Sequence, residues 1–206
     1  MATRRPVVIL FLKAPVIGAA KRRLVADIGA VAAWRFYRQT VQRVGGDLCR
    51  CPVWDSVLAI APNRSSRQAK AGFPMLKHLQ YQEQGQGNIG IRMARCLDRY
   101  APRPRLLIGG DIPDVTTEIV REAFAKLACA DLIFGPAEDG GFWVIGQRGP
   151  ARVGCLFANV AWSGSQTLSA TLANVPRIRQ VAFASMLMDI DTGRALAAWR
   201  NPRASG

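Results

Sequence analysis

The chain has few of the residues that build several common kinds of site. It contains one histidine, His78, and its five cysteines do not have the paired Cys/His spacing of a zinc site. No apolar run approaches the ~18 residues of a membrane span, and the basic N-terminus runs directly into a short apolar strand, unlike a secretory leader. These absences exclude a zinc cluster and a spanning helix, and they predict a cytoplasmic protein with reduced cysteines.

Acidic residues are also scarce, with 14 Asp and Glu against 28 Lys and Arg, so the formal net charge is +14. A positive field favours anionic ligands such as nucleotides, nucleic acid or acidic lipid. The arginines are scattered through helical segments, which is typical of solvated helix faces and argues against a nucleic-acid-binding tail. With 206 residues, half of them hydrophobic, we expect a single domain over 1–206 with its core at about 6–200.

Apolar runs and helical periodicity alternate along the chain, which predicts an α/β fold. The helix over 20–44 is expected to end at Gly45-Gly46. Three cysteines, Cys96, Cys129 and Cys155, lie in apolar or helical runs and are expected in the core. The predicted strands cover residues 7–12, 53–61, part of 73–83, 106–108, 131–134, 142–145 and 178–183, and the other predicted helices cover 65–72, 89–100, 115–130, 166–174 and 194–200.

The stretch Arg105–Asp114 lies at the centre of this pattern. Its apolar run, 106–108, predicts a strand buried on both faces, and Asp111 follows two glycines at the carboxyl end of that strand. Ligands of open α/β sheets collect at this edge, so Asp111 is well placed to hold a divalent cation against phosphate oxygens. The alternative is that Asp111 closes a turn or caps a helix, although Asp114 or Thr116 is the better cap for the next helix.

Two glycine-containing loops are candidates for binding a nucleotide. The first contains Gly18 between cationic residues Lys13, Lys21 and Arg23, and it connects a strand to a helix, which is a phosphate-binding arrangement without the G-x-x-x-x-G-K-[ST] spacing. Exposed cations flanking a turn are the alternative. The second loop, 82–90, carries amides and glycines that could contact the edge of a nucleobase, or it could be a flexible connector. Its candidate binding residues are Gln84, Gly87 and Gly90.

Two further acidic segments follow. Glu138 and Asp139 lie at a turn between two predicted strands, where Asp-Gly-Gly is also an ordinary hairpin signal. Asp189 and Asp191 are two residues apart, so they share a face if the segment is extended. Ser163 or Ser165 is expected to cap the helix over 166–174.

Taken together, these segments resemble the bacterial glycosyltransferase family called "transferase 1, radical-SAM/selenodomain-associated", one branch of which is named for arsenosugar biosynthesis. The resemblance implies a GT-A, or nucleotide-diphospho-sugar transferase, fold: a Rossmann-like three-layer αβα sandwich with a mixed, mostly parallel sheet. Molybdenum-cofactor and phospholactate nucleotidyltransferases are relatives by fold. The matching motifs run in order from residue 8 to about 198 and lie at 11–24, 87–93, 110–114, 135–142, 162–163 and 189–192.

Carried over by position, the resemblance assigns a role to each candidate. It makes Asp111 a metal ligand, Asp139 the catalytic acidic turn, and Asp189 or Asp191 the source of a second metal ligand. The chain departs from the family pattern at Lys21-Arg-Arg-Leu24, where Lys-Thr-Arg-Leu is usual, and by having Gly109 before Gly110-Asp111, where Gly-Thr-Asp is usual. The residues that would bind the nucleotide phosphates are Lys13, Lys21 and Arg23.

The resulting expectation is a transferase that uses Mg²⁺ or Mn²⁺ and moves a glycosyl group from a nucleotide-sugar to a small-molecule acceptor. The near alternative is a nucleotidyltransferase, guanylyl- or cytidylyl-type, that takes a nucleoside triphosphate and a phosphorylated small molecule. The distant alternative is a non-enzymatic module that binds a nucleotide or RNA. The sequence makes no prediction about oligomeric state.

Overall fold

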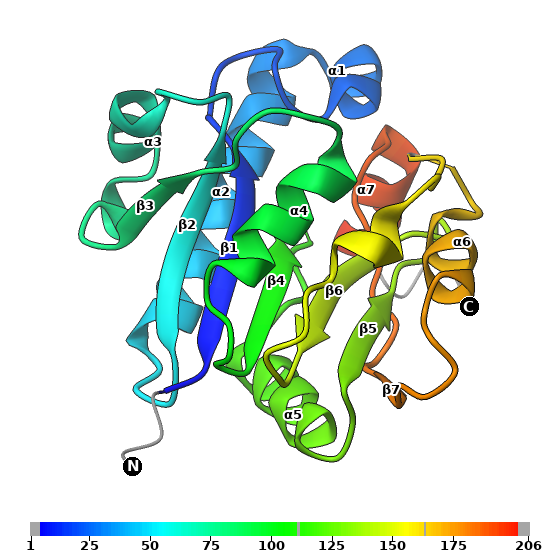
Figure 1. The fold of residues 1–206 in the computed structure, drawn as a ribbon. Helices are drawn as coiled ribbons and strands as arrows, with labels where there is room; N and C mark the ends of the chain where they lie inside the picture. Colours follow the sequence, from blue (N-terminus) through cyan, green and yellow to red (C-terminus); the bar gives the residue numbers. More distant parts are fainter. Residues whose placement is uncertain (1–4, 111, 163, 202–206) are drawn as a thin grey trace.

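The computed structural model describes residues 5–110, 112–162 and 164–201. A seven-stranded sheet runs through it in the order β3-β2-β1-β4-β6-β5-β7 (Figure 1). Strand β6 is antiparallel to β4 and β5, and the other neighbouring pairs are parallel, which confirms the mixed, mostly parallel sheet. The strands are β1 Val7–Lys13, β2 Asp55–Ala61, β3 Gln80–Glu83, β4 Arg105–Gly109, β5 Leu132–Pro136, β6 Phe142–Gln147 and β7 Val181–Phe183.

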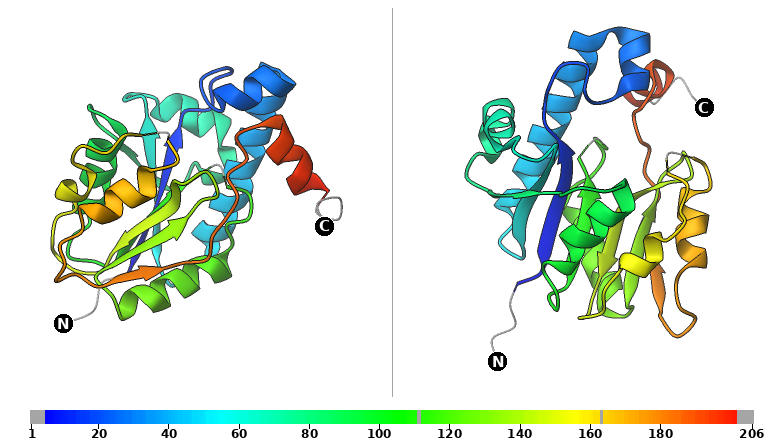
Figure 2. Two further views of the ribbon diagram at one scale, coloured as in Figure 1. Left: turned by 90° about the vertical axis from the view of Figure 1, so that its right-hand side faces the viewer. Right: turned by 45° about the horizontal axis from the view of Figure 1, so that its top comes forward.

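Helices cover both faces of the sheet (Figures 1 and 2). Alternate residues of β1 enter different cores, with Leu10 among the residues of α2 and α5 and Ile9 among those of α4 and η2. None of the described helices is long and apolar enough to cross a membrane. The helices are α1 Arg22–Ile28, α2 Ala30–Arg50, α3 Ser66–Gly72, α4 Ile89–Asp98, α5 Thr117–Ala128, α6 Thr167–Ala173 and α7 Gly193–Arg200, with 3₁₀ turns η1 Pro74–Leu76 and η2 Gly154–Phe157.

A third apolar cluster packs α1, the start of α2 and α7 together beyond the sheet. Leu24 of α1, Phe36 of α2 and Leu196 of α7 are buried in it, together with Ile190 from the segment that precedes α7. Figure 2 shows α7 lying beside the α1–α2 hairpin, far from β7 in the sheet. This cluster brings the last helix of the chain to the loop that follows the first strand.

The predicted helix over 20–44 differs from the structure in two ways. It breaks at Gly29, whose φ of 84° is left-handed, so α1 and α2 are separate helices. Gly45 and Gly46 do not end the helix, which continues to Arg50. A Cβ at Gly45 would lie 2.7 Å from a methyl group of Leu76, so this glycine serves close packing and not termination.

Among the smaller expectations, a strand within 73–83 and a buried Cys96 are confirmed, and the burial of Cys129 and Cys155 is wrong. Within 73–83 the strand is β3, Gln80–Glu83, because the earlier residues Pro74–Leu76 form a 3₁₀ turn. Cys96 is buried, and its burial raises the pKa of the thiol to about 11. Cys129 and Cys155 are exposed, because they lie at the end of α5 and in η2 and not within long helices.

The helix caps agree with the sequence in one case out of two. Thr116 caps α5, its hydroxyl accepting a hydrogen bond from the Ile119 N–H at 3.3 Å, as one of the two predicted caps. Within the described residues, α6 has no side-chain cap from Ser165, and its N-cap position is Gln166. The other predicted cap, Ser163, lies outside the described residues.

Candidate active site at the carboxyl edge of the sheet

The strand order reverses between β1 and β4, so the crevice beyond their carboxyl ends is the expected ligand site of this kind of sheet. The loops after β1, β3 and β5 converge on this edge, because these strands run in the same direction. Asp111 follows β4 and lies outside the described residues, so its predicted role as a metal ligand stays a prediction. The site is therefore built here from the three loops and the acidic segment before α7.

The loop after β1 is fixed where it begins. The Tyr37 hydroxyl accepts a hydrogen bond from the Lys13 backbone N–H at 3.0 Å and donates to the Lys13 carbonyl at 2.8 Å. The Trp34 indole N–H donates to the Pro15 carbonyl at 2.7 Å. The Lys13 side chain is exposed, and Gly18 has a left-handed φ of 78° with no described atom within 4 Å of an added Cβ. The loop is thus anchored to α2, while Lys13 and Gly18 are exposed.

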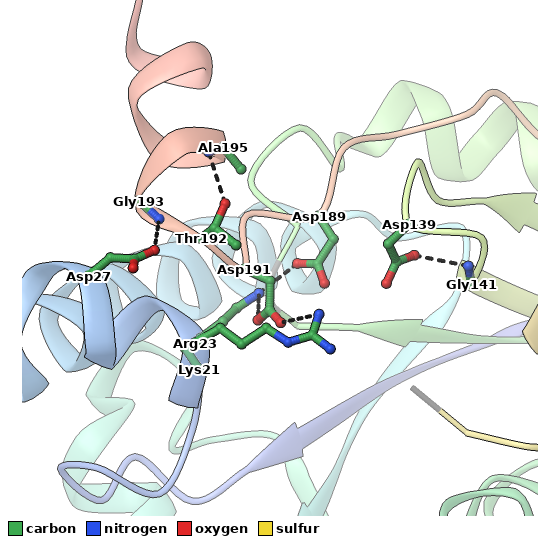
Figure 3. Close-up of polar contacts among 10 residues, drawn as sticks. All are labelled: Lys21, Arg23, Asp27, Asp139, Gly141, Asp189, Asp191, Thr192, Gly193 and Ala195. Atoms are coloured by element: carbon green, nitrogen blue, oxygen red, sulfur yellow. Dashed lines mark hydrogen bonds and ion pairs between the residues drawn. The ribbon is translucent and has the colours of Figure 1, made fainter. Parts of the chain in front are cut away.

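Lys21 joins this loop to the acidic segment near the end of the chain. Its backbone is left-handed (φ 54°), and its side chain is only 2% exposed. The ammonium nitrogen lies 2.6 Å from Asp189 Oδ1 and 3.5 Å from Asp191 Oδ1, and Arg23 Nη1 lies 3.8 Å from Asp191 Oδ2 (Figure 3). One lysine contacts both aspartates, so the prediction that Asp189 and Asp191 share a face is confirmed.

The acidic segment is held on both sides. Leu187 forms backbone hydrogen bonds with the turn after β5: its N–H donates to the Pro136 carbonyl at 3.1 Å, and its carbonyl accepts from the Glu138 N–H at 3.3 Å. After the aspartates, Asp27 Oδ2 accepts a hydrogen bond from the Gly193 N–H at 2.7 Å (Figure 3). The Thr192 hydroxyl caps α7 by accepting from the Ala195 N–H at 3.1 Å. Both carboxylates are therefore presented from a fixed backbone.

Asp139 lies at the turn between β5 and β6, which form the antiparallel pair that the hairpin signal predicted. Its Oδ1 accepts a hydrogen bond from the Gly141 N–H at 2.9 Å, which orients the carboxylate. Gly140 has a φ of 84°, and a Cβ there would lie 2.0 Å from the Ser165 carbonyl oxygen, so only glycine fits. The hairpin is confirmed, and the catalytic role of Asp139 stays a prediction.

Two neighbouring cavities meet at Asp139 and Asp189, which line both of them. The larger has a volume of about 360 Å³, and six of its ten described lining residues are charged, including Glu138, Asp191 and Arg194. The smaller has a volume of about 190 Å³ and mainly apolar walls between α4 and β6. The site thus offers a charged compartment and an apolar compartment on either side of shared carboxylates.

Gln84, a predicted contact for the nucleobase, is buried at 1% exposure. Its amide nitrogen donates to the carbonyls of Leu12 at 2.8 Å and Ala59 at 2.9 Å, and its oxygen accepts from Arg92 Nη1 at 2.9 Å. These bonds tie the loop after β3 to β1 and β2, so the observed role of this amide is to position the loop. Its contact with a nucleobase stays a prediction.

The two glycines predicted for the same loop differ in their surroundings. Gly87 has a φ of 107°, a conformation that favours glycine. Gly90 lies in the first turn of α4, where a Cβ would come within 2.5 Å of the Trp162 ring and 2.7 Å of Phe157. Gly90 therefore allows α4 to approach Trp162 closely, and its predicted contact with a nucleotide is untested.

Three residues of the site were not among the candidates chosen from the sequence. Asp27 fixes the start of α7 and Arg92 fixes Gln84, but both lie in ordinary helical patterns, so neither gave a local signal. Trp162 lines the smaller cavity. Its place directly before Ser163-Gly-Ser165 in the sequence was the available signal, and that segment served only for the resemblance.

The described residues fit a divalent cation that is shared with a substrate better than one held by protein alone. They contain no group of three or more Asp, Glu, His or Cys side chains that could hold a metal ion. Asp189 and Asp191 nevertheless place two carboxylate oxygens around the Lys21 ammonium group. The position between the two carboxylates therefore favours a positive charge, such as that of a metal cation. Mg²⁺ usually takes one or two protein carboxylates and completes its shell with water and phosphate oxygens.

A family model described as "Uncharacterized protein conserved in bacteria (DUF2064)" matches residues 40–164. A comparison with curated protein sequences finds no match. Among solved structures, the chain is similar to a provisionally assigned nucleotide-diphospho-sugar transferase from Desulfovibrio desulfuricans G20, with 26% identity and a TM-score of 0.88 over 98% of this chain and 90% of that one.

More distant structures share the fold. The 4-diphosphocytidyl-2C-methyl-D-erythritol synthase of Anaerococcus prevotii DSM 20548 has 9% identity and a TM-score of 0.63, with 99% of this chain and 100% of that one covered. Glucosyl-3-phosphoglycerate synthase of Mycobacterium tuberculosis, solved with Mn²⁺, UDP and phosphoglyceric acid, has 10% identity and a TM-score of 0.53, with 91% and 70% covered. These neighbours are transferases, and they confirm the predicted GT-A-like fold class.

Proposed function

This chain belongs to the bacterial family DUF2064, and we propose that it is a transferase that moves a glycosyl group from a nucleotide-sugar to a small acceptor. The observation that carries the proposal is the contact of Lys21 with Asp189 and Asp191, which joins a cationic loop to an acidic segment at the carboxyl edge of the sheet. The transferase neighbours support it. We also propose the narrower relationship to the radical-SAM/selenodomain-associated transferases, from the motifs quoted above.

In this proposal the cationic loop binds the diphosphate of the donor. The exposed side chains of Lys13 and Arg23 approach the phosphate oxygens and neutralise the charge that develops as the nucleotide leaves. Lys21 is buried against Asp189, so its role is to hold the acidic segment in place beside the loop. Hydrogen bonds from Trp34 and Tyr37 keep the loop anchored to α2 meanwhile.

The acidic residues divide into two roles. Asp189 and Asp191, together with Asp111, would hold Mg²⁺ or Mn²⁺, and the bound ion would supply positive charge to the leaving diphosphate. The Mn²⁺ and UDP in the glucosyl-3-phosphoglycerate synthase structure support this choice. Asp139 would orient the acceptor hydroxyl and take its proton as the new glycosidic bond forms. The hydrogen bond from the Gly141 N–H sets the direction of that carboxylate.

A thermal-shift screen of UDP-, GDP-, ADP- and CMP-sugars, each with and without Mn²⁺ or Mg²⁺, tests the proposal. At a hundredfold excess over Kd a ligand adds about 2.7 kcal/mol of stability, which raises Tm by roughly 5–10 °C in a chain of this size. We expect one nucleotide-sugar to give a metal-dependent rise of this kind. The donor found in this way is then mixed with candidate acceptors to detect transfer.

Two matched variants locate the binding in the site. Asp189→Asn removes a carboxylate from the site, and Asp47→Asn removes an exposed carboxylate that pairs with Arg50 on α2. The nucleotide-dependent rise in Tm should fall by more than half in the first variant and stay unchanged in the second. Equal rises in both variants would remove Asp189 from the proposed site, and no rise with any nucleotide in the native chain would remove the proposed function.

Nucleotidyl transfer is the second candidate, because Asp189 and Asp191 present two adjacent carboxylates, the arrangement that suits a nucleoside triphosphate with more than one cation. In that reaction an oxygen of a phosphorylated acceptor forms a bond to the α-phosphorus, and pyrophosphate leaves. The synthase of Anaerococcus prevotii supports this alternative at the level of fold. Pyrophosphate released from a triphosphate, and not from a nucleotide-sugar, would decide for it.

A further inference from the structure

The smaller cavity lies between α4 and β6, next to Asp139. We propose that it is the acceptor subsite and that it takes a flat, mainly apolar ring that carries a hydroxyl group. This inference rests on the proposed function, because it treats Asp139 as the group that faces the acceptor hydroxyl. It adds to that function the chemical class of the acceptor, which neither the family nor the neighbouring structures supply.

The walls of the cavity are aromatic and aliphatic, and its size suits one ring. An apolar cavity of ~150 Å³ binds benzene, so a volume of about 190 Å³ holds a six-membered ring with a small substituent. Backbone at Gly109, Gly141 and Gly164 completes the wall without side chains. The apolar side chains of the wall are Ile89, Met93, Ile112, Phe142, Trp143 and Trp162.

The aromatic walls are held from behind, so the cavity does not depend on a ligand to form. The Trp162 ring packs against Phe157 with a centroid distance of 5.9 Å, and it also lies against the first turn of α4 at Gly90. Phe142 packs edge-on against Phe134 at 5.6 Å. Rings fixed in this way lose little conformational entropy when they contact a ligand ring.

The polar groups of the cavity are too few for a sugar. A pyranose carries hydroxyls around its whole edge, and each needs a partner when it is buried. Among the described wall residues, the Thr167 hydroxyl already bonds to the carbonyls of Ala161 and Gly164, and Asp189 is paired with Lys21. Among the described side chains of the wall, Asp139 remains for a ligand, which matches a ring with one polar substituent.

Fluorine NMR on the full chain, without nucleotide or metal, tests the proposal with two probes. One is 4-fluorobenzyl alcohol, a flat ring with a hydroxyl, and the other is 2-deoxy-2-fluoro-D-glucose. A probe with so few atoms should bind with a Kd of about 1 mM. We expect the aromatic probe to reach this affinity and the sugar probe to bind at least tenfold more weakly.

Two leucine substitutions provide a matched pair. An added Cβ meets no atom within 4 Å at either Gly164 or Gly149, so neither change strains the fold, but only Gly164 lines the cavity. Gly164→Leu should weaken the aromatic probe at least tenfold, and Gly149→Leu should leave its Kd unchanged.

Three results would overturn the acceptor assignment: tighter binding of the fluorinated sugar, no binding of either probe, or equal effects of the two leucine variants. Because the probes need no nucleotide, the result is independent of the donor screen. If the probes fail while a nucleotide-sugar stabilises the chain, the proposed function stands and this subsite assignment falls. If a nucleotide fails while the aromatic probe binds, the proposed donor chemistry falls instead.

Discussion

Lys21 is a buried cation that contacts two carboxylates of the candidate site. Its side chain is 2% exposed, whereas those of Asp189 and Asp191 are 22% and 36% exposed. The ammonium group of Lys21 is therefore shielded from water, whereas the two carboxylates are partly hydrated. Burial of this kind makes the partners interdependent, because removing one leaves the other's charge in a poorly hydrated place.

Lys21→Met keeps the length of the side chain and removes its charge. We expect the free energy of unfolding to fall by about 1–3 kcal/mol, below the 3–5 kcal/mol typical of fully buried pairs because the aspartates keep some water. Urea denaturation measures the change. Lys126→Met is the control, since its exposed ammonium pairs with Glu122 at 2.7 Å and its loss should cost less than about 0.5 kcal/mol. Equal stability of the two variants would contradict the role given to Lys21.

At the level of elements, glycine in α2 has a packing role. A Cβ at Gly45 would lie 2.7 Å and 3.1 Å from two methyl groups of Leu76 and 3.2 Å from Leu10, and both leucines are fully buried. At Gly46 the nearest atom is the terminal methyl group of Met75 at 3.3 Å, on a half-exposed side chain that can move. Two adjacent helical glycines thus have different reasons to lack a side chain.

Alanine at these positions separates packing from helix propensity. Replacing glycine by alanine inside a helix normally stabilises it by about 0.5–1 kcal/mol. Gly46→Ala should show this gain, whereas Gly45→Ala should lose about 1–3 kcal/mol because the core there is already full. Thermal and urea unfolding of the two variants measures the difference. A stabilised Gly45→Ala variant would show that Leu76 can move aside.

The sequence predicted the elements well and their ends less well. Apolar runs identified the strands, because buried strands need continuous apolar residues, and both the hairpin at 137–141 and the Thr116 cap rest on local chemistry. The break at Gly29 follows from a left-handed φ of 84° that glycine adopts readily, whereas the packing of Gly45 and Gly46 in the middle of α2 depends on contacts with Leu76 and Met75. No local pattern contains such contacts.

The candidate site was predictable only in parts. Each acidic segment and each loop carried its own signal, but the contact between Lys21 and Asp189 joins residues 168 positions apart. The hydrogen bonds of the Gln84 amide with Leu12, Ala59 and Arg92 could not be predicted either. They form because β3 pairs with β2 and β2 pairs with β1. The residue types therefore indicated the chemistry of the site, but they did not show which residues contact one another.

For the whole molecule, part of the net charge of +14 lies on arginines that are bound to the protein's own backbone. Several guanidinium groups donate hydrogen bonds to backbone carbonyls and so hold segments of the chain together. Arg105, fully buried, bonds to the carbonyls of Arg103, Gly149 and Ala151. Other arginines that donate to carbonyls are Arg38, Arg43, Arg95, Arg103 and Arg148.

We therefore expect weak RNA binding. A fluorescent 20-nucleotide oligouridine should bind with a Kd of about 100 µM or weaker at 150 mM KCl, within the non-specific range, because the arginines are scattered along the chain and several of them are bound to backbone carbonyls. Fluorescence anisotropy at 50, 150 and 300 mM KCl measures both the affinity and its salt dependence. Submicromolar, steeply salt-dependent binding without metal would favour the RNA-binding alternative over the transferase.

The contact between Lys21 and Asp189 can form only late in the synthesis of the chain. A ribosome adds about 5–20 residues per second, so roughly 10–30 seconds pass between the appearance of the lysine and that of its aspartate, 168 positions later. Once residues 55–61 have been added, β1 and β2 can pair, but Asp189 and Asp191 have not yet been made. Under the proposed function, a nascent or prematurely terminated chain would therefore lack the carboxylates that bind the cation and its nucleotide.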